Sequence, residues 1–446
     1  SEHEQRRDLG AARDAAVEAA AAAFESWRAL TPRERGEYLV ALGEALDKRA
    51  EVTTDLITLE LGMARQMTRD VQVLHPAHIF AREIEYVGRV TWEEKMGNST
   101  VYYDPVGVVA AITPWNGPIM QIAVKIAPAL IAGCTVVCKP SELAPLGTYI
   151  LAEAAQAARF PAGVLNVVQG LGPSVGEQLV SHPKVDMVSF TGSVRGGARV
   201  GELAARDIKR AVMELGGKSP AVILDDATLE VLDRAVKHTA FTCTLINGQV
   251  CEALTRLIVP RAKLAVVERM AAEAFEGAQV GDPFDESTVV GPMISNAQRD
   301  KVVAYIRRGI EEGARVVTGG PEPPEGLDRG YFVRPTVFSD VRPGMRIAQE
   351  EIFGPVLSII PYDGGDDEAV QIANGTPYGL AAAVFGADTE RAWEVGRRID
   401  CGTINVNGAE YDLEAPFGGH KKSGIGREHG VAAIREYLQS RAVQAA

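Results

Sequence analysis

The sequence is poor in cysteine and has no long apolar run, and both scarcities limit its class. Its 446 residues include five cysteines, at Cys134, Cys138, Cys243, Cys251 and Cys401. The odd number and the absence of a Cys-x-x-Cys pair argue against a disulfide framework or a zinc knuckle and fit a reducing compartment. No window approaches the ~18 consecutive apolar residues of a membrane span. We therefore expect a cytoplasmic protein without a membrane partner.

Basic residues are also scarce relative to acidic ones. Lysine and arginine total 46 against 59 acidic residues, which gives a formal net charge of −13. An acidic surface disfavours contact with nucleic acid or anionic lipid, so neither is expected as a partner. The seven histidines do not cluster: His75 and His78 flank Pro76, and no cysteine is near them in sequence. We predict no metal site.

The pattern of apolar residues predicts an α/β protein of two or three domains. The first ~80 residues read as helices, with Thr31 as an N-cap before Pro32. From about residue 106, short apolar strands alternate with helical stretches, which indicates a parallel sheet covered on both faces and a doubly wound nucleotide-binding layout. These strands are expected at 108–113, 135–140, 164–168, 185–190 and 210–215.

A second series of the same kind follows from about residue 220, and two segments break the pattern. Its strands are expected at 221–226, 256–260, 356–362, 381–386 and 403–407. Residues 85–105 read as an extended hairpin with Gly97 and Asn98 near the turn, and the last ~20 residues as a short helix and a tail. We predict a first domain over 1–84 and 106–216, a second over 217–430, and bridging or oligomerisation elements at 85–105 and 431–446.

Several polar residues stand at the predicted strand ends, each with a functional and a structural interpretation. Gly192 and Ser193 lie where a strand meets a helix, a turn that suits a pyrophosphate, whereas GLGPSVG (170–176) departs from the dinucleotide fingerprint because its third glycine is one residue late. Glu214 is either a general base or a partnered structural acid, and Asn116 is either an oxyanion donor or a turn residue. Cys251 has polar, glycine-bearing flanks, which fit a nucleophile better than a buried core thiol.

Seven stretches, taken together and in order, resemble the aldehyde dehydrogenase superfamily over nearly the whole chain. They are TPWN (113–116), KPSE (139–142), FTGSVRG (190–196), ELGGKSP (214–220), NGQVC (247–251), EEIFGPV (350–356) and PFGGHKKSGIGRE (416–428). The resemblance implies two doubly wound parallel-sheet lobes with a bridging β hairpin. It also implies oxidation of a small-molecule aldehyde with NAD⁺ or NADP⁺ by a homodimer or homotetramer.

The resemblance assigns roles residue by residue. Cys251 resembles the nucleophile, Glu214 the base that activates water, Asn116 and the Cys251 N–H the oxyanion hole, and Lys125 a lysine near the proton path. Lys139 and Glu142 would hold the adenosine ribose, Ser193 the pyrophosphate, and Glu351 and Phe353 the nicotinamide ribose and ring. Further cofactor contacts are expected at Ile112, Thr113, Pro114, Trp115, Ser141, Gly172, Gly176, Phe190, Thr191, Gly192, Leu215 and Gly216. Because Glu142 would repel a 2′-phosphate, NAD⁺ is expected to be preferred. The structural alternative for Lys125 is a surface ion pair.

The sequence departs from the family pattern in two places. It starts near the first long helix, without the strands that usually precede it. Glu252 follows the nucleophile directly, where relatives more often carry a small or apolar residue. Glu252, Tyr411 and Phe417 are expected to line the substrate site. Glu252 either recognises a hydroxyl or cationic substrate group or turns away and pairs with Arg256 at helical i, i+4 spacing.

Three other functions remain open on the sequence. A CoA-acylating relative or an acyl-phosphate reductase would usually lack the glutamate equivalent to Glu214. A non-catalytic homologue with the same fold would tend to lose the nucleophile. All three of Cys251, Glu214 and Asn116 are present. The sequence therefore favours the hydrolytic enzyme.

Overall fold

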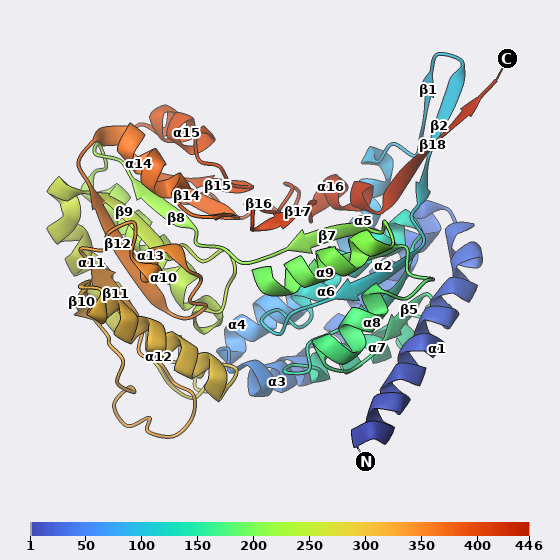
Figure 1. Ribbon diagram of the computed structural model, residues 1–446, viewed down its shortest axis with the longest axis horizontal. Coiled ribbons are helices and arrows are strands. Elements are labelled where there is room, and N and C mark those ends of the chain that lie inside the picture. Colours follow the sequence, from blue (N-terminus) through green and yellow to red (C-terminus); the bar gives the residue numbers. More distant parts are fainter. Residues whose placement is uncertain (1, 446) are drawn as a thin grey trace.

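The computed structural model describes residues 2–445, which form two sheet-based halves and a projecting arm (Figure 1). The chain opens with helices whose bounds are α1(Glu2–Arg28), α2(Pro32–Asp47), α3(Ala50–Leu61), α4(Arg65–Arg69) and α5(His75–Tyr86), with a π-helical turn at Asp70–Leu74. Thr31 caps α2 through a capping box with Glu34, and Pro32 is the first residue of that helix, as the sequence predicted. No helix among the described residues is long and apolar enough to cross a membrane.

The first half contains a six-stranded sheet with the order β17-β7-β6-β3-β4-β5. Its strands are β3(Val108–Ile112), β4(Thr135–Lys139), β5(Leu165–Val167), β6(Met187–Thr191), β7(Arg210–Glu214) and β17(Gly424–Ile425). The first five are parallel and were predicted from their apolar runs, whereas β17 pairs antiparallel with β7 and comes from far along the chain. A two-residue strand has no periodicity of apolar residues, so β17 could not be predicted from the sequence.

Helices cover both faces of this sheet, because alternate residues of its strands enter different clusters. Val109 and Ala111 pack into the large core with α2, α5 and α6, while Val108 and Ala110 face the smaller core with α8 and α9. The helices between the strands are α6(Met120–Ala132), α7(Leu146–Ala157), α8(Glu177–Val180) and α9(Val194–Arg206). The doubly wound arrangement is therefore confirmed.

The second half contains a seven-stranded sheet with the order β10-β11-β12-β9-β8-β14-β15. Its strands are β8(Pro220–Ile223), β9(Arg256–Pro260), β10(Arg315–Thr318), β11(Thr336–Ser339), β12(Val356–Tyr362), β14(Ala381–Phe385) and β15(Thr403–Val406). All are parallel except the edge strand β10. Its helices are α10(Leu229–Thr244), α11(Leu264–Glu276), α12(Asn296–Glu311), α13(Arg346–Gln349), α14(Gly365–Asn374) and α15(Thr389–Arg397), and a two-stranded sheet joins β13(Tyr378–Gly379) to β16(His420–Lys421).

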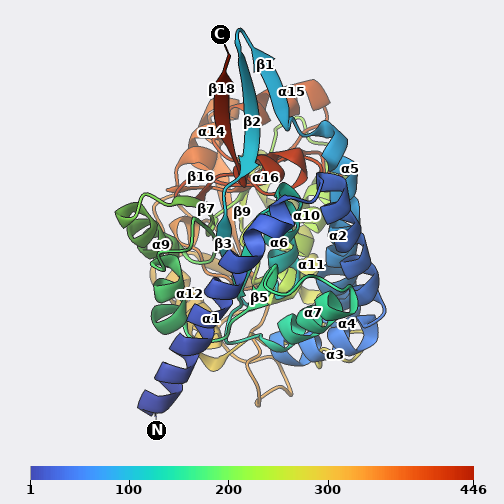
Figure 2. The ribbon, with the colours of Figure 1, turned by 90° about the vertical axis from the view of Figure 1, so that its right-hand side faces the viewer.

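The arm is a three-stranded antiparallel sheet that extends beyond the body in both views (Figures 1 and 2). It consists of β1(Glu93–Met96), β2(Ser99–Pro105) and β18(Leu438–Gln444), and β18 follows the short helix α16(Gly430–Glu436). The predicted hairpin with its turn near Gly97 and Asn98 is confirmed, although its first strand begins only at Glu93, and the predicted tail after the short helix is a third strand, β18. Residues before Glu93 are helical or irregular, and the tail pairs with β2 because that strand offers a free edge to the returning chain.

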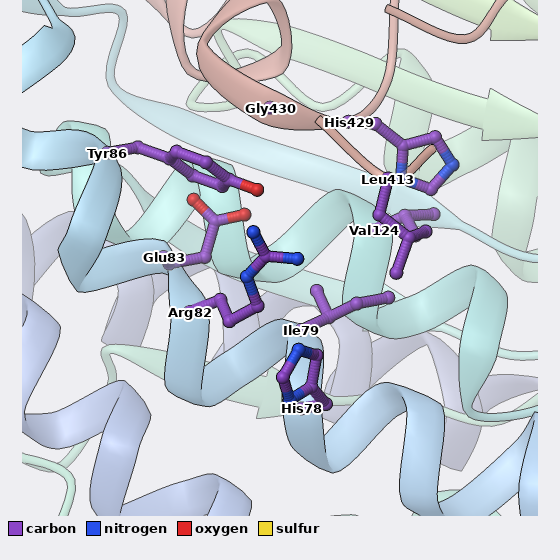
Figure 3. A pocket seen from close by; sticks show the side chains of 9 residues that line it. All are labelled: His78, Ile79, Arg82, Glu83, Tyr86, Val124, Leu413, His429 and Gly430. Atoms are coloured by element: carbon purple, nitrogen blue, oxygen red, sulfur yellow. The ribbon is translucent and has the colours of Figure 1, made fainter. Parts of the chain in front are cut away.

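A small cavity between α5, α6 and the segment before α16 holds a buried carboxyl group (Figure 3). Glu83 is 3% exposed, and its Oε2 has no hydrogen-bond partner among the described residues. Burial raises the pKa of Glu83 from 4.5 to about 8. The folded protein therefore holds this side chain in its neutral form at neutral pH.

We expect Glu83→Gln to stabilise the protein most at alkaline pH. Between the unfolded pKa near 4.5 and the folded pKa of about 8, only the folded state keeps the proton, so stability falls as pH rises through this window. Each unit of pKa shift is worth ~1.4 kcal/mol. Thermal unfolding should give a variant with a higher Tm than the wild type at pH 8 and a smaller gap at pH 5. Glu44→Gln, at an exposed position of α2, is the control, and an equal gap at both pH values would contradict the prediction.

Candidate active site

A tightly held loop between α10 and β9 presents Cys251. Just after α10, Ile246 and Asn247 adopt left-handed backbone angles (φ 49° and 58°), a conformation that asparagine tolerates better than β-branched residues do. The Asn247 amide donates to the carbonyls of Gly62 (3.0 Å) and Pro292 (2.8 Å). These bonds fix the turn that delivers the half-buried Cys251.

Asn116 joins this loop to the first sheet. It follows β3 and donates a hydrogen bond from Nδ2 to the carbonyl of Gln249 at 2.9 Å. The Gln249 side chain is itself anchored, because its Nε2 donates to the Ile246 carbonyl and its Oε1 accepts from the Ile294 N–H. An amide nitrogen carries two hydrogens, so one remains for another acceptor. The side chain of Asn116, the predicted oxyanion donor, is thus oriented by the loop that carries Cys251.

Glu214 ends β7 with a buried and unpartnered carboxyl group. It is 2% exposed, and neither oxygen has a hydrogen-bond partner among the described residues. Burial, followed by the nearby Glu428 carboxylate, raises the pKa of Glu214 well above 4.5. Gly418 passes so close that a Cβ there would lie 2.7 Å from Glu214 Oε1. The structural interpretation of a partnered acid does not hold, because the group is neither paired nor capped.

Lys125 lies on α6 and is completely buried, so the alternative of a surface ion pair is wrong. Its ammonium group pairs with the buried Glu428. Lys125 and Arg427 lower the pKa of Glu214, opposing the effects of burial and Glu428. Sequence reasoning did not single out Glu428, although it is the last residue of the stretch PFGGHKKSGIGRE.

Acidic groups surround the thiol of Cys251. Burial, and then Glu252, Glu351, Glu214 and Glu428, raise the pKa of Cys251 well above 9.0. Burial also raises the pKa of Glu252 to about 7. The free thiol is therefore protonated at neutral pH, and the like-charge effect that Glu252 was predicted to exert is present.

Glu252 has no ion pair with Arg256, so that alternative was wrong. Arg256 begins strand β9, and no helix exists to set an i, i+4 spacing. Its guanidinium is buried and donates to the backbone carbonyls of Lys218, Ile372 and Ala373 at 2.7–2.8 Å. The arginine that seemed available to Glu252 is used to hold the second half together.

The strand register brings the predicted cofactor residues to one edge of the first sheet. Ile112 is level with Lys139 on one side and with Phe190 on the other, and Thr191 is level with Glu214. The carboxyl ends of parallel strands form the crevice where nucleotides bind in open α/β sheets. Residues 112–116, 139–142, 190–193 and 214–216 therefore lie at neighbouring strand ends.

A helix N-terminus and a buried lysine give this edge the chemistry that a dinucleotide needs. Ser193 caps α9, with its Oγ accepting from the Gly196 N–H at 3.1 Å. Gly192 and Gly196 lie against the Phe190 ring, where a Cβ would come within 2.6 Å and 3.0 Å of it. The free N–H groups and dipole of such an end attract phosphate.

The part of this edge that follows β4 holds opposite charges. The Lys139 ammonium, 3.8 Å from a Glu142 carboxylate oxygen, donates to the Pro140 carbonyl at 2.6 Å. The Ser141 hydroxyl is engaged within the turn that follows β4, because its Oγ accepts a hydrogen bond from the Leu143 N–H. Gly172 and Gly176 open and close a π-helical turn, and Gly176 lies against the Lys139 side chain.

Glu351 and Phe353 reach this edge from the second half. Glu351 accepts a hydrogen bond from the Gly217 N–H at 3.2 Å, and it leaves no room for a side chain at Gly216. Phe353 has φ 64° and meets the Trp115 ring edge-on at 5.3 Å. A buried carboxylate, an aromatic wall, a helix N-terminus and a lysine fit the ribose, nicotinamide and phosphate parts of NAD.

Three polar residues near Glu351 and Phe353 were missed by the sequence analysis. Gln298 on α12 donates to the Phe353 carbonyl at 2.6 Å. Burial raises the pKa of Glu351, and Lys301, one turn after Gln298, opposes that shift. Lys218 is buried without a hydrogen-bond partner for its Nζ among the described residues, and burial lowers its pKa to about 7. Lys218 stands within the stretch ELGGKSP, whereas the α12 residues carried no signal beyond a polar helix face.

Tyr411 and Phe417, predicted to line the substrate site, both meet His429. The Tyr411 hydroxyl lies 3.2 Å from His429 Nε2, and the Phe417 ring contacts the imidazole edge-on at 5.7 Å. Burial, Glu252 and Cys251 raise the pKa of Tyr411. Tyr411 therefore shares an electrostatic environment with the thiol. The described residues contain no group of three or more potential ligands that could hold a metal ion.

Comparison with known proteins adds an independent result. A model of the aldehyde dehydrogenase family matches residues 7–443. The chain is 45% identical over 431 residues to a 3-succinoylsemialdehyde-pyridine dehydrogenase of a Pseudomonas species, covering 96% of this chain and 90% of that protein. It superposes with a TM-score of 0.95 and 44% identity on an aldehyde dehydrogenase C variant of Pseudomonas syringae bound to NAD⁺ and octanal, covering 98% and 89%. An aldehyde dehydrogenase of Mycobacterium tuberculosis with NAD⁺ gives a TM-score of 0.94 and 41% identity, covering 97% and 90%.

Proposed function

Since this chain belongs to the aldehyde dehydrogenase family and is an NAD-dependent oxidoreductase, we propose that it forms a thioester on Cys251 and hydrolyses it to a carboxylic acid. The observation that carries the proposal is the unpartnered, buried carboxyl of Glu214 in the electrostatic neighbourhood of the Cys251 thiol. In this proposal residues 1–84 and 106–216 bind the cofactor, 217–430 carry the nucleophile, and 85–105 with 431–446 serve assembly.

Cys251 acts first as the nucleophile. Because burial and the neighbouring carboxyl groups raise its pKa, the Cys251 thiol is protonated at rest, and it must release its proton to solvent as it attacks the aldehyde carbon. The remaining amide hydrogen of Asn116 and the Cys251 N–H then stabilise the oxyanion. When bound, NAD⁺ supplies the redox chemistry as the hydride acceptor.

Glu214 completes the reaction by activating water. A carboxylate removes a proton from water only in its ionised form, and Lys125 and Arg427 favour that form against burial and Glu428. The same residue disfavours the CoA-acylating and acyl-phosphate alternatives. Glu142 beside Lys139 supports a preference for NAD⁺ over NADP⁺, because a carboxylate accepts from a ribose 2′-hydroxyl and repels a 2′-phosphate.

We expect Cys251→Ala to abolish NADH formation from aldehydes while NAD⁺ binding stays within about twofold of wild type, since no covalent intermediate can form. The measurement is NADH absorbance with an aldehyde panel, with and without CoA or phosphate, together with NAD⁺ titration by calorimetry. Cys243→Ala is the control, because that thiol is buried and donates to the Leu254 carbonyl. Substantial activity in Cys251→Ala would refute the nucleophile assignment.

Glu214→Gln should stop the enzyme after one turnover. Glutamine keeps the shape of the side chain and cannot take a proton from water, so stopped-flow traces should show a burst of about one NADH per site and then little turnover. Wild-type turnover should rise with pH, with an apparent pKa well above 4.5, because the pKa of Glu214 is raised and its ionised form is required. Normal steady-state turnover of the variant would remove Glu214 from the hydrolytic step.

Glu252 is proposed to select against negatively charged substrates. Together with Glu214, Glu351 and Glu428 it makes the surroundings of Cys251 acidic, which disfavours a further carboxylate. We expect wild-type kcat/KM to be lower for succinic semialdehyde than for butanal or trimethylaminobutyraldehyde, and Glu252→Gln to narrow the difference about tenfold, as ~1.4 kcal/mol of repulsion would imply. A wild type with its highest kcat/KM for succinic semialdehyde would contradict this role of Glu252. An unchanged order of kcat/KM values in Glu252→Gln would also contradict it.

The projecting arm is proposed to assemble the protein into a closed homodimer or homotetramer. A three-stranded sheet without a covering helix buries little apolar surface by itself, and Met96 and Val443 on it remain about half exposed. Light scattering at micromolar concentration should give a particle mass of two or four times the 47.7 kDa mass of the chain. A stable monomer would contradict the proposal.

A further inference from the structure

His429 occupies a backbone conformation that side chains rarely adopt. Its φ is 68° and its ψ is 149°, a region that is essentially reserved for glycine. The next residue is a glycine, Gly430, where a Cβ would lie 2.3 Å from the carbonyl oxygen of Glu414. The backbone at residues 429 and 430 therefore lies close to the backbone of Glu414. A glycine at position 429 would relieve the backbone strain, but the chain has a histidine there. Strain of this kind persists where the side chain has a task.

The imidazole of His429 is neutral and is engaged on one side. Burial, with His75 and Lys125 nearby, lowers the pKa of His429 to about 4. In Figure 3 its ring lies on the far side of Leu413 and Val124 from the Glu83 carboxyl. The Nε2 atom of His429 lies 3.2 Å from the Tyr411 hydroxyl, and the two rings stand edge-on with centroids 6.0 Å apart.

Tyr411 has no other hydrogen-bond partner for its hydroxyl among the described residues. Its segment is anchored on both sides, where Glu414 pairs with Arg82 (2.6 Å) and Arg89 (2.9 Å) and where the Asn405 amide donates to the Ala409 carbonyl (2.6 Å). These contacts fix the backbone around Tyr411 and make no bond to its phenol. The direction of the hydroxyl therefore depends on His429.

We propose that His429 is a positioning residue that holds the Tyr411 phenol beside Cys251 and Glu252, so that the enzyme recognises aldehydes carrying a distal hydroxyl or other hydrogen-bonding group. The inference rests on the proposed function and deepens it. A neutral imidazole leaves the phenol one further hydrogen bond to make, and Glu252, with its pKa of about 7, supplies a second polar group. Tyr411 is 50% exposed in the free protein, so an apolar aldehyde that covers it would displace its water and leave both groups without a partner, which costs affinity.

The test compares para-hydroxybenzaldehyde with para-tolualdehyde, which differ by a hydroxyl and a methyl group of similar size. In His429→Leu and in Tyr411→Phe, KM for the hydroxylated aldehyde should rise about tenfold, as the loss of one hydrogen bond implies, while kcat stays near wild type. The kcat/KM for para-tolualdehyde should stay within about twofold. His429→Gln, which keeps a hydrogen-bonding group at similar reach, should restore most of the preference, and the double variant should be no worse than either single one.

An unchanged preference in Tyr411→Phe, or additive losses in the double variant, would overturn the proposal. Equal losses on both aldehydes in His429→Leu would also overturn it, because they would assign His429 to the neighbouring Glu428 or to the backbone alone. If His429→Leu does not fold, Tyr411→Phe and His429→Gln still decide the question. A wild type that forms no NADH with propanal or either aromatic aldehyde would contradict the proposed function, and a retained but unshifted activity would contradict this inference alone.

Discussion

The hydrogen bond from Asn116 to the Gln249 carbonyl is the contact on which the site depends. It runs from the end of a strand in the first sheet to the loop that carries Cys251, and so sets the thiol relative to the cofactor edge. Asn247 and the Gln249 side chain anchor the same loop to Gly62, Pro292 and Ile294. A shift of 1 Å between reacting groups can cost about 100-fold in rate. This hydrogen-bond network therefore has to hold the Cys251 loop of the second half accurately against the first sheet.

The second constraint is electrostatic. Four carboxyl groups raise the pKa of Cys251, and three of them, Glu214, Glu252 and Glu351, have raised pKa values of their own. Such a cluster is costly to bury, and buried Lys125, paired with Glu428, offsets part of the cost. A raised pKa makes a carboxylate a stronger base, which is the property that general base catalysis requires.

Close approaches explain why small residues recur at this site. Gly418 leaves space for the Glu214 carboxyl, and Gly216 does the same for Glu351, where an added Cβ would lie 2.4 Å from a carboxylate oxygen. His429 is the opposite case, because it keeps a side chain where the backbone favours none. The small residues at Gly418 and Gly216 are explained by the lack of space for a side chain. The side chain of His429 needs a different explanation, such as its contact with Tyr411.

The sequence alone determined the parallel strands and the residues at their ends. Continuous apolar runs have no alternative but burial on both faces, and the polar residues that follow them must then meet at one edge, as Asn116, Lys139 and Glu214 do. The tertiary structure decided what depends on distant segments. Strand β17 against Glu214, β18 in the arm, the Lys125–Glu428 pair and the removal of Arg256 from Glu252 all join residues far apart or out of helical register. Local periodicity carries no information about such partners, because they are chosen by the packing of the whole chain.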